Sequence, residues 1–297
     1  MKFIFGSISY LFAVCCWAQP TIALVSDTQK PMCVEKIWRR TNHNTLATQL
    51  IFQQLIKTQP TDLFILGDVV SVGHSERKWK AIDGYLKESR AKGIAVTALL
   101  GNHDVMFKAT KGEAVFQKRF PDHVRTGFFR ITDSVAFVLL NSNFSKMSDS
   151  DRAQQKSWLT TTMNELDANP AVRVIVVGCH HAPFSNSKVV GSSTEVQSAF
   201  VPAYLASAKA KLFITGHSHG FEHFKKSGKD FLVIGGGGGI HQPLRTKDAA
   251  HEELEPGYKP MFHYLLLQRS HSSLKLASYP LLTDFSGFGE PHIISIP

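Results

Sequence analysis

The chain has 297 residues, of which 43% are hydrophobic and 19% are charged. This length and balance are those of a globular protein with a large core, and the lack of a repeat of about 20–50 residues excludes a solenoid. The formal net charge is +9, but Lys and Arg are scattered along the sequence. We therefore interpret the charge as a solvated basic surface that suits anionic substrates, and we expect no nucleic-acid partner.

The first residues have the features of a secretory signal peptide. Residues 1–18 begin with Lys2, continue with the mostly apolar residues 3–14, and end with the small residues Cys16 and Ala18. The apolar stretch is shorter than the roughly 20 residues of a membrane span, and Gly and Ser interrupt it. We expect its removal, export to a periplasmic or extracellular location, and no transmembrane span.

Removal of this segment leaves two of the four cysteines in the mature chain. Cys33 and Cys179 lie far apart in the sequence, and two cysteines do not make a disulfide framework. Pairing in an oxidising compartment stays open. Cys179 ends an apolar run, so a buried, inert thiol is the interpretation that we prefer.

Strands and helices alternate in the first part of the mature chain. Apolar, β-branched runs predict buried strands at 21–26, 62–66 and 94–100. Apolar positions at helical spacing predict helices at 44–57 and 75–92 between these strands. This β-α-β-α-β order is typical of parallel strands joined by helical crossovers.

The later part of the chain contains more strands and fewer helices. One helix is predicted at 151–167, with Asp151 as its cap and Gln154 as the reciprocal partner, and another at 195–209, which Pro202 interrupts or starts. Because strands joined by turns dominate here, a two-sheet sandwich flanked by helices fits better than one doubly wound sheet. The predicted strands are 128–132, 135–140, 173–177, 211–215, 231–234, 261–268 and 274–278.

Five consecutive glycines, residues 235–239, interrupt the late strands. They are consistent with a flexible turn. They are equally consistent with a wall at which the backbone must approach a site closely. The segment contains neither a phosphate-loop lysine nor dinucleotide-binding spacing, so it does not predict a nucleotide loop.

Polar side chains that can bind metals follow five of the predicted strands. Because the ends of neighbouring parallel strands lie about 5 Å apart, these side chains should crowd into one space. Carboxylates and imidazoles gathered there would be poorly compensated without cations. Two divalent ions would satisfy them, and oxygen and imidazole donors without thiolate suit Mn, Fe, Zn or Mg. The residues are Asp27, Gln29, Asp68, Asn102, His103, Asp104, His181, His217 and His219.

In this order, the motifs resemble those of the calcineurin-like metallophosphoesterase superfamily. The motifs are Asp27-x-Gln29, Gly67-Asp68, Gly101-Asn102-His103-Asp104, His181-x-Pro183 and Gly216-His217-x-His219, and the match covers roughly residues 21–239. The resemblance implies one domain over residues 19–297, built as a four-layer α/β/β/α sandwich with two mixed sheets.

The resemblance also implies a two-metal centre. One ion would bind Asp27, Gln29 and His219, the other would bind Asn102, His181 and His217, and Asp68 would bridge them. The family's ligand lies two residues before the proline, which selects His181 and leaves His180 as a neighbour. His103 would be a catalytic residue that binds no metal, oriented by Asp104.

These implications lead to an expected activity. We expect a metal-dependent phosphoric ester hydrolase that acts on phosphorylated small molecules, either phosphomonoesters or phosphodiesters. The two ions would activate a hydroxide for in-line attack, while His103 would stabilise or protonate the departing oxygen.

Two departures from the family pattern bear on metal and substrate. The usual first motif ends in His, whereas Gln29 offers a harder amide oxygen, which favours Mn or Mg at that position. A glutamine here is also similar to the Mn-dependent ADP-ribose and CDP-alcohol diphosphatases, so a nucleotide diphosphatase is an alternative. Purple acid phosphatases carry Tyr where this chain has Ser71, which disfavours a tyrosinate–iron(III) centre.

An alternative from another class is a non-catalytic, metal-dependent binding protein. Such a protein has no need of an acid/base pair that binds no metal. The presence of both His103 and Asp104 therefore favours the enzyme.

Overall fold

The computed structural model describes residues 20–38 and 41–297. The predicted signal peptide at 1–18, with Cys15 and Cys16, lies outside these residues. In the described ranges Cys33 is exposed, Cys179 is buried, and both are free thiols.

One six-stranded sheet contains the first three strands of the chain, which are parallel. β1 (Ile22–Val25) pairs with β2 (Asp62–Ile65), and β2 pairs with β3 (Ala95–Ala98). On the other side β1 pairs antiparallel with β10 (His263–Ser270). Antiparallel pairing continues through β11 (Ser273–Pro280) and β12 (His292–Ile296), which gives the order β12-β11-β10-β1-β2-β3.

The second six-stranded sheet is also mixed and has the order β4-β5-β6-β7-β9-β8. β5, β6, β7 and β9 are parallel, while the edge strands β4 and β8 run antiparallel to their neighbours. The bounds are β4 Phe128–Thr132, β5 Val135–Leu139, β6 Val174–Gly178, β7 Ala210–Thr215, β8 Phe221–Lys226 and β9 Lys229–Ile234.

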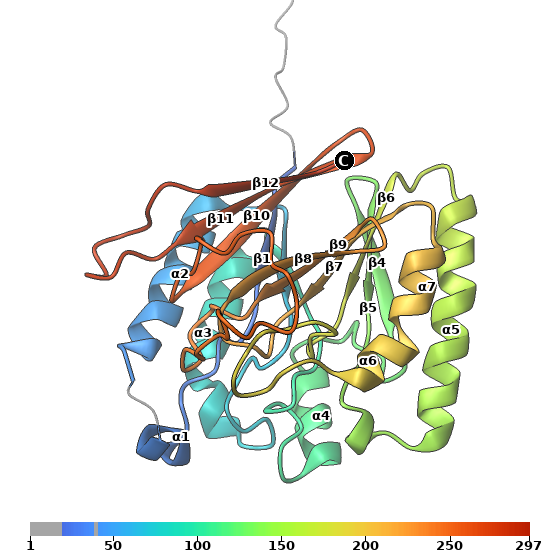
Figure 1. The fold of residues 1–297 in the computed structure, drawn as a ribbon. Helices are drawn as coiled ribbons and strands as arrows, with labels where there is room; N and C mark the ends of the chain where they lie inside the picture. Colours follow the sequence, from blue (N-terminus) through green and yellow to red (C-terminus); the bar gives the residue numbers. More distant parts are fainter. Residues whose placement is uncertain (1–19, 39–40) are drawn as a thin grey trace, which may run out of the picture.

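The two sheets face each other and helices cover their outer faces (Figure 1). Between the sheets, apolar residues such as Leu24, Phe64 and Phe137 form one core, in which the Phe64 and Phe137 rings stack 4.1 Å apart. Period-two alternation sends the neighbouring strand residues, such as Val25, to the outer face. There they pack against α2 (Asn44–Thr58) and α3 (Glu76–Ala91).

The outer face of the second sheet has its own core. It packs against α5 (Asp149–Ala168), α6 (Thr194–Ala199) and α7 (Val201–Ala206). The four-layer α/β/β/α sandwich of two mixed sheets is therefore confirmed. That residues 19–297 form a single domain stays a prediction.

Most predicted elements are present, with shifted ends. The helix at 195–209 is two short helices, because Pro202 sits in the first turn of α7. The cap of α5 is Ser148, whose side-chain oxygen accepts a hydrogen bond from Asp151 N. The Asp151 carboxylate in turn accepts from Ser148 N, so the predicted Asp151–Gln154 pair is wrong. Elements that were not predicted are α1 (Cys33–Trp38), α4 (Ala109–Gln117), the 3-10 turn Phe144–Lys146, β8 and β12.

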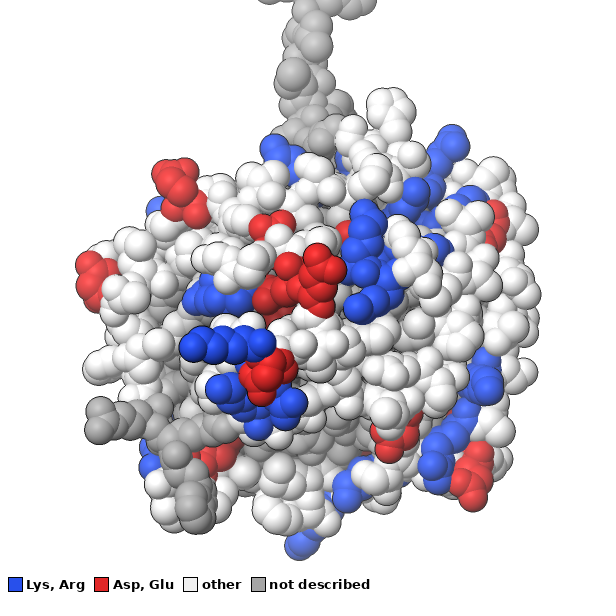
Figure 2. Space-filling view, viewed as in Figure 1, with Lys and Arg blue, Asp and Glu red and all other residues white. Residues whose placement is uncertain are grey.

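Within the described ranges, every helix is too short or too polar to traverse a bilayer. On the face of the molecule shown in Figure 2, Lys and Arg are interspersed with Asp and Glu.

Candidate metal centre

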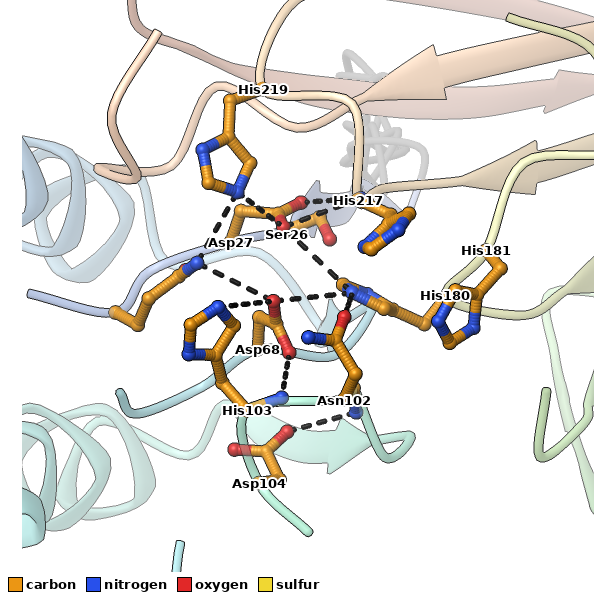
Figure 3. Close-up of polar contacts among 12 residues, drawn as sticks. Ser26, Asp27, Asp68, Asn102, His103, Asp104, His180, His181, His217 and His219 are labelled. Carbon is orange, nitrogen blue, oxygen red and sulfur yellow. Dashed lines mark hydrogen bonds and ion pairs between the residues drawn. The ribbon is translucent and has the colours of Figure 1, made fainter. Parts of the chain in front are cut away.

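The parallel strands of both sheets end at one place, and their polar residues converge there (Figure 3). β1 and β2 lead to Asp27 and Asp68, and β3 leads to Asn102. From the other sheet, β6 leads to His180 and β7 to His217 and His219. Asp27 and Asp68 are 0% and 1% exposed, so both carboxylates are withdrawn from water.

Two groups of ligand atoms share one carboxylate. Asp27, Asp68 and His219 form the first group, and Asp68, His180 and His217 form the second, with the ligand atoms of each group within 4.8 Å of one another. Asp68 belongs to both groups, which is the arrangement that a bridging ligand between two ions requires.

The histidines are oriented so that their Nε2 atoms face the carboxylates. His219 Nδ1 lies 2.7 Å from Ile240 O, and His180 Nδ1 lies 2.9 Å from Leu66 O. Because a carbonyl only accepts, each Nδ1 must donate, which leaves Nε2 free to bind a metal. These Nε2 atoms lie 3.2 Å from Asp27 Oδ1 and 3.2 Å from Asp68 Oδ2, respectively.

Two amide side chains complete the ring of donors. Asn102 Oδ1 lies 3.1 Å from His180 Nε2. The terminal amide of Gln29 lies 3.3 Å from His219 Nε2 and 3.4 Å from Asp68 Oδ2. With its oxygen towards the site, the Gln29 nitrogen donates to the main-chain carbonyls of Asp27 at 3.1 Å and Asp68 at 3.0 Å. That orientation satisfies the amide and presents oxygen to the centre.

The charges of the centre are strongly coupled. Burial by itself raises the pKa of Asp68, but His180 and His103 outweigh it and hold that pKa well below its usual range. Burial lowers the pKa of His180, yet Asp68 and Asp27 raise it to about 9. Burial and the adjacent His181 and His180 lower the pKa of His217 well below its usual value. The carboxylates thus draw positive charge to the place where the Nε2 atoms point.

His103 lies beside this cluster without belonging to either group. Its main-chain N donates to Asp68 Oδ1 at 2.8 Å, and its Nδ1 lies 3.1 Å from Ser71 O, so Nδ1 donates. Its Nε2 is 3.8 Å from Asp68 Oδ2, and the residue is 8% exposed. The ring therefore presents Nε2 at the edge of the centre.

Asp104 does not orient His103 through its side chain, which corrects the predicted contact. Its carboxylate accepts from three main-chain amides, those of Gly101 at 2.9 Å, Val70 at 3.2 Å and Val69 at 3.3 Å. Burial and the nearby Asp68 raise the pKa of Asp104 to about 7. Asp104 fixes the turns that carry Asp68 and Asn102, while the Ser71 carbonyl orients the His103 ring.

The adjacent histidines after β6 point to different partners. His180 enters the second group of ligand atoms, whereas His181 Nδ1 lies 2.8 Å from Ser142 Oγ. The His181 ring stays next to the centre, with its centroid 4.4 Å from that of His217. The structure thus brings the predicted ligands together, with His180 inside the second group of ligand atoms and His181 beside it but outside both groups.

The glycine run at 235–239 is a wall against the centre. Gly237 N donates to Ser26 O at 2.9 Å and Gly239 N donates to Asp27 O at 2.8 Å. A Cβ on Gly239 would lie 2.6 Å from the His219 ring. Of the two interpretations left open by the sequence, close approach of the backbone is the one confirmed.

Three of the converging residues have strained backbones. Asp27, Asp68 and His217 have positive φ angles of 60°, 49° and 67°. Non-glycine residues rarely adopt this conformation, and such strain gathers at functional sites. It turns the side chains sharply off the strand ends into the shared space.

The donor set fits a pair of divalent ions. Buried carboxylate oxygens, imidazole Nε2 atoms and amide oxygens face one another, and cations between them would satisfy all of them at once. The outer ring nitrogens of His180 and His219 are held by carbonyls, as those of metal-binding histidines usually are.

Comparisons with known proteins agree with this geometry. The model of the family described as calcineurin-like phosphoesterase matches residues 20–221. Among curated proteins, none matches the chain.

Solved structures share the fold at low sequence identity. A purple acid phosphatase, PPD1 from yellow lupin (Lupinus luteus), aligns with a TM-score of 0.70 and 14% identity over 94% of this chain. That alignment spans about half of the lupin chain, 54%. GAP50, described as the anchor in the inner membrane complex of Plasmodium, aligns with a TM-score of 0.66 and 15% identity. The alignment covers 94% of this chain and 89% of the GAP50 chain.

A dimetal phosphatase from Danio rerio gives a TM-score of 0.57 and 15% identity, covering 93% of this chain and 98% of that one. At these identities the neighbours establish the fold, and the family follows from the match over residues 20–221 together with the converging strand-end motifs. The chain belongs to the calcineurin-like phosphoesterases, a family of metal-dependent phosphoric ester hydrolases.

Proposed function

We propose that this chain is an exported, two-metal phosphoesterase that hydrolyses phosphomonoesters or phosphodiesters. The observation that carries the proposal is the pair of ligand groups sharing Asp68, with His103 beside them and outside both. The export part rests on the residues at 1–18. N-terminal sequencing of protein recovered outside the cytoplasm tests it, with a new N-terminus near residue 19 expected.

The proposed ligand sets differ in one residue from those that the sequence implied. Asp27, Gln29, Asp68 and His219 would hold one ion. Asp68, Asn102, His180 and His217 would hold the other, with His180 in place of His181. Oxygen donors from two carboxylates and two amides make this a hard site, which favours manganese.

When bound, two such ions supply polarisation of the phosphoryl group and activation of an attacking water. His103 acts on the other side of the phosphorus. Its Nδ1–H is held by Ser71 O, so Nε2 is the ring nitrogen that faces the centre and would carry a second proton. As the P–O bond to the alcohol breaks, that proton passes to the departing oxygen. Nε2 lies 3.8 Å from Asp68 Oδ2, which keeps it beside the residue that both ligand groups share.

Turnover by the mature protein tests this function. After chelation, Mn, Mg, Zn or Fe is added back, and hydrolysis of a phosphomonoester, a phosphodiester and a nucleotide diphosphate is measured. His103→Ala should lower kcat by roughly 10²–10⁴-fold while bound metal stays unchanged. His271→Ala, an exposed turn histidine, is the matched control and should behave like the native chain.

The same measurement separates the alternatives. Preferred hydrolysis of the nucleotide diphosphate would identify a diphosphatase. That outcome would agree with Gln29, whose position in the first motif is similar to that of the Mn-dependent diphosphatases. Tight binding of two metals without turnover of any compound would overturn the proposal. The chain would then be a non-catalytic binding protein, a possibility raised by GAP50, the anchor in the inner membrane complex of Plasmodium.

A further inference from the structure

The turn that follows His103 and Asp104 holds an aromatic residue in an unfavourable backbone conformation. Phe107 has φ 61°, and Lys108 N donates to Met106 O at 2.7 Å, which closes a γ-turn around it. A γ-turn with positive φ is rare and strained, and a bulky residue seldom occupies it. The Phe107 side chain is 76% exposed, so burial of the ring does not compensate the strain.

This turn is hydrogen-bonded into the same unit as His103. Gly73 N donates to His103 O at 3.1 Å, and Met106 N donates to the same oxygen at 3.4 Å. The His103 ring in turn bonds Ser71 O. Residues 71–74 and 103–107 therefore form one braced loop pair. These hydrogen bonds fix the place of the turn relative to His103.

The aromatic ring has a second ring beside it. His74 Nδ1 lies 3.3 Å from Met106 O, which fixes the imidazole against the turn. The His74 and Phe107 rings meet edge to face, with centroids 6.4 Å apart and an interplanar angle of 85°. His74 holds one edge of Phe107 and leaves most of the Phe107 ring to solvent.

The platform made by Phe107 and His74 is close enough to the centre to contact a bound substrate. Phe107 is the fourth residue after His103, so their Cα atoms are at most about 14 Å apart even in an extended chain, and the turn shortens that distance. His103 marks the side from which the alcohol part of the phosphoester departs. An exposed flat ring within this reach of His103 suits a flat ring in the alcohol.

We infer that Phe107, braced by His74, stacks on a nucleobase of the substrate, so that nucleotides are preferred over phosphoesters without a ring. This inference rests on the proposed phosphoesterase function and names its substrate class. Every nucleobase, whatever its identity, offers a π face to an aromatic side chain. Stacking of this kind contributes substantially to binding affinity. The strain at Phe107 is the kind of backbone outlier that functional sites retain.

The test compares AMP with ribose 5-phosphate. In both compounds the phosphate is attached to the 5′-oxygen of ribose, and only AMP carries a base. In the native chain kcat/KM should favour AMP by roughly 10-fold, the size expected for one stacked base. Phe107→Ala should abolish this preference while leaving kcat/KM for ribose 5-phosphate within about twofold, and Phe107→Trp should restore it. Ile293→Ala on β12, an equally truncated exposed apolar residue, should keep the native preference.

A further variant separates the ring from its backbone. Phe107→Gly relieves the strain of the positive φ and removes the ring, so it should lose the preference for AMP as Phe107→Ala does. Equal kcat/KM for the two compounds in the native chain would overturn the inference. So would an equal fall on both compounds in Phe107→Ala, or hydrolysis of other phosphoesters but of neither member of the pair. If no phosphoester is hydrolysed at all, the proposed function fails first and the inference fails with it.

Discussion

The two halves of the metal centre come from different sheets and are held in different ways. The half from β1, β2 and β3 supplies carboxylate and amide oxygens, and the half from β6 and β7 supplies imidazoles. Asp27 of the first sheet accepts from His217 N of the second at 3.0 Å. In the other direction, His180 of the second sheet donates to Leu66 O of the first.

Each half is therefore oriented by the main chain of the other. Neither sheet alone would present its donors correctly, because the orienting partner lies across the sandwich. The core between the sheets, with Phe64 stacked on Phe137, sets the spacing on which these crossed hydrogen bonds depend. The site is a product of how the sheets dock, and the predictions below test how far each half depends on the other.

The largest effect is expected at the residue that both ligand groups share. Asp68→Asn keeps the shape of the side chain but removes the charge that both ions need. We expect loss of both metals and a fall in kcat beyond the roughly 10²–10⁴-fold that removal of one acid/base group costs. Metal analysis and turnover measure this. Asp62→Asn, at the start of the same strand β2 and paired with Arg130, should retain both ions. Retention of full activity by Asp68→Asn would disprove the shared role.

The next effect compares two neighbours in the imidazole half. His180→Ala should lose one ion per chain, because His180 Nε2 faces Asp68 and Asn102. His181→Ala should keep both ions, because His181 lies outside both groups of ligand atoms. The ratio of bound metal in the two variants measures the difference. The reverse result would restore the ligand that the sequence spacing selected.

The positions of most donors could be predicted from the sequence, whereas their orientations could not. Apolar runs ending in Asp, Asn or His place those residues at strand ends, and Asp27, Asp68 and Asn102 lie where this rule expects them. A spacing rule could not choose between His180 and His181, since the choice depends on which way the chain leaves β6. The Asp104 carboxylate also turns away from its neighbour, towards three amides contributed partly by another strand end.

Elements with weak patterns were the ones that the sequence did not reveal. β12 is an edge strand with an exposed alternate face, and α4 contains Gly112 and has no side-chain cap. The amino-acid sequence also does not indicate the strained turns at Asp27, Asp68 and His217. Their positive φ angles arise from the packing around these residues. Long-range contacts thus hold these residues in a backbone conformation that their local preferences disfavour.

A moderate effect is expected from the glycine wall. Gly239→Ala would place a Cβ 2.6 Å from the His219 ring and displace it from Asp27. We expect the affinity of the first site for its ion to fall by roughly 10–100-fold, the range for disturbed metal-ligand orientation. Titration with Mn of the metal-free protein measures it. Gly257→Ala, where a Cβ meets open space, is the matched control. Equal affinities in the two variants would show that the glycine segment can shift to make room for the added methyl group.

The smallest effect on the centre is expected from the strut beneath β5, which contributes no ligand. Gln155, fully buried on α5, accepts from Asn141 N at 2.8 Å and donates to Asn141 O at 2.9 Å. Two residues on, Asn143 Nδ2 donates to Leu100 O of the other sheet at 3.2 Å. Gln155→Leu leaves both Asn141 groups unpaired, which should lower the free energy of unfolding by about 1–3 kcal/mol for each buried group left unsatisfied. Urea unfolding measures this loss. Metal content and kcat should stay near native values, because the Gln155 side chain bonds the main chain of Asn141 and not a proposed metal ligand. A loss of metal in Gln155→Leu would mean that the crossed hydrogen bonds need this third support, and that the two halves are not held by each other alone.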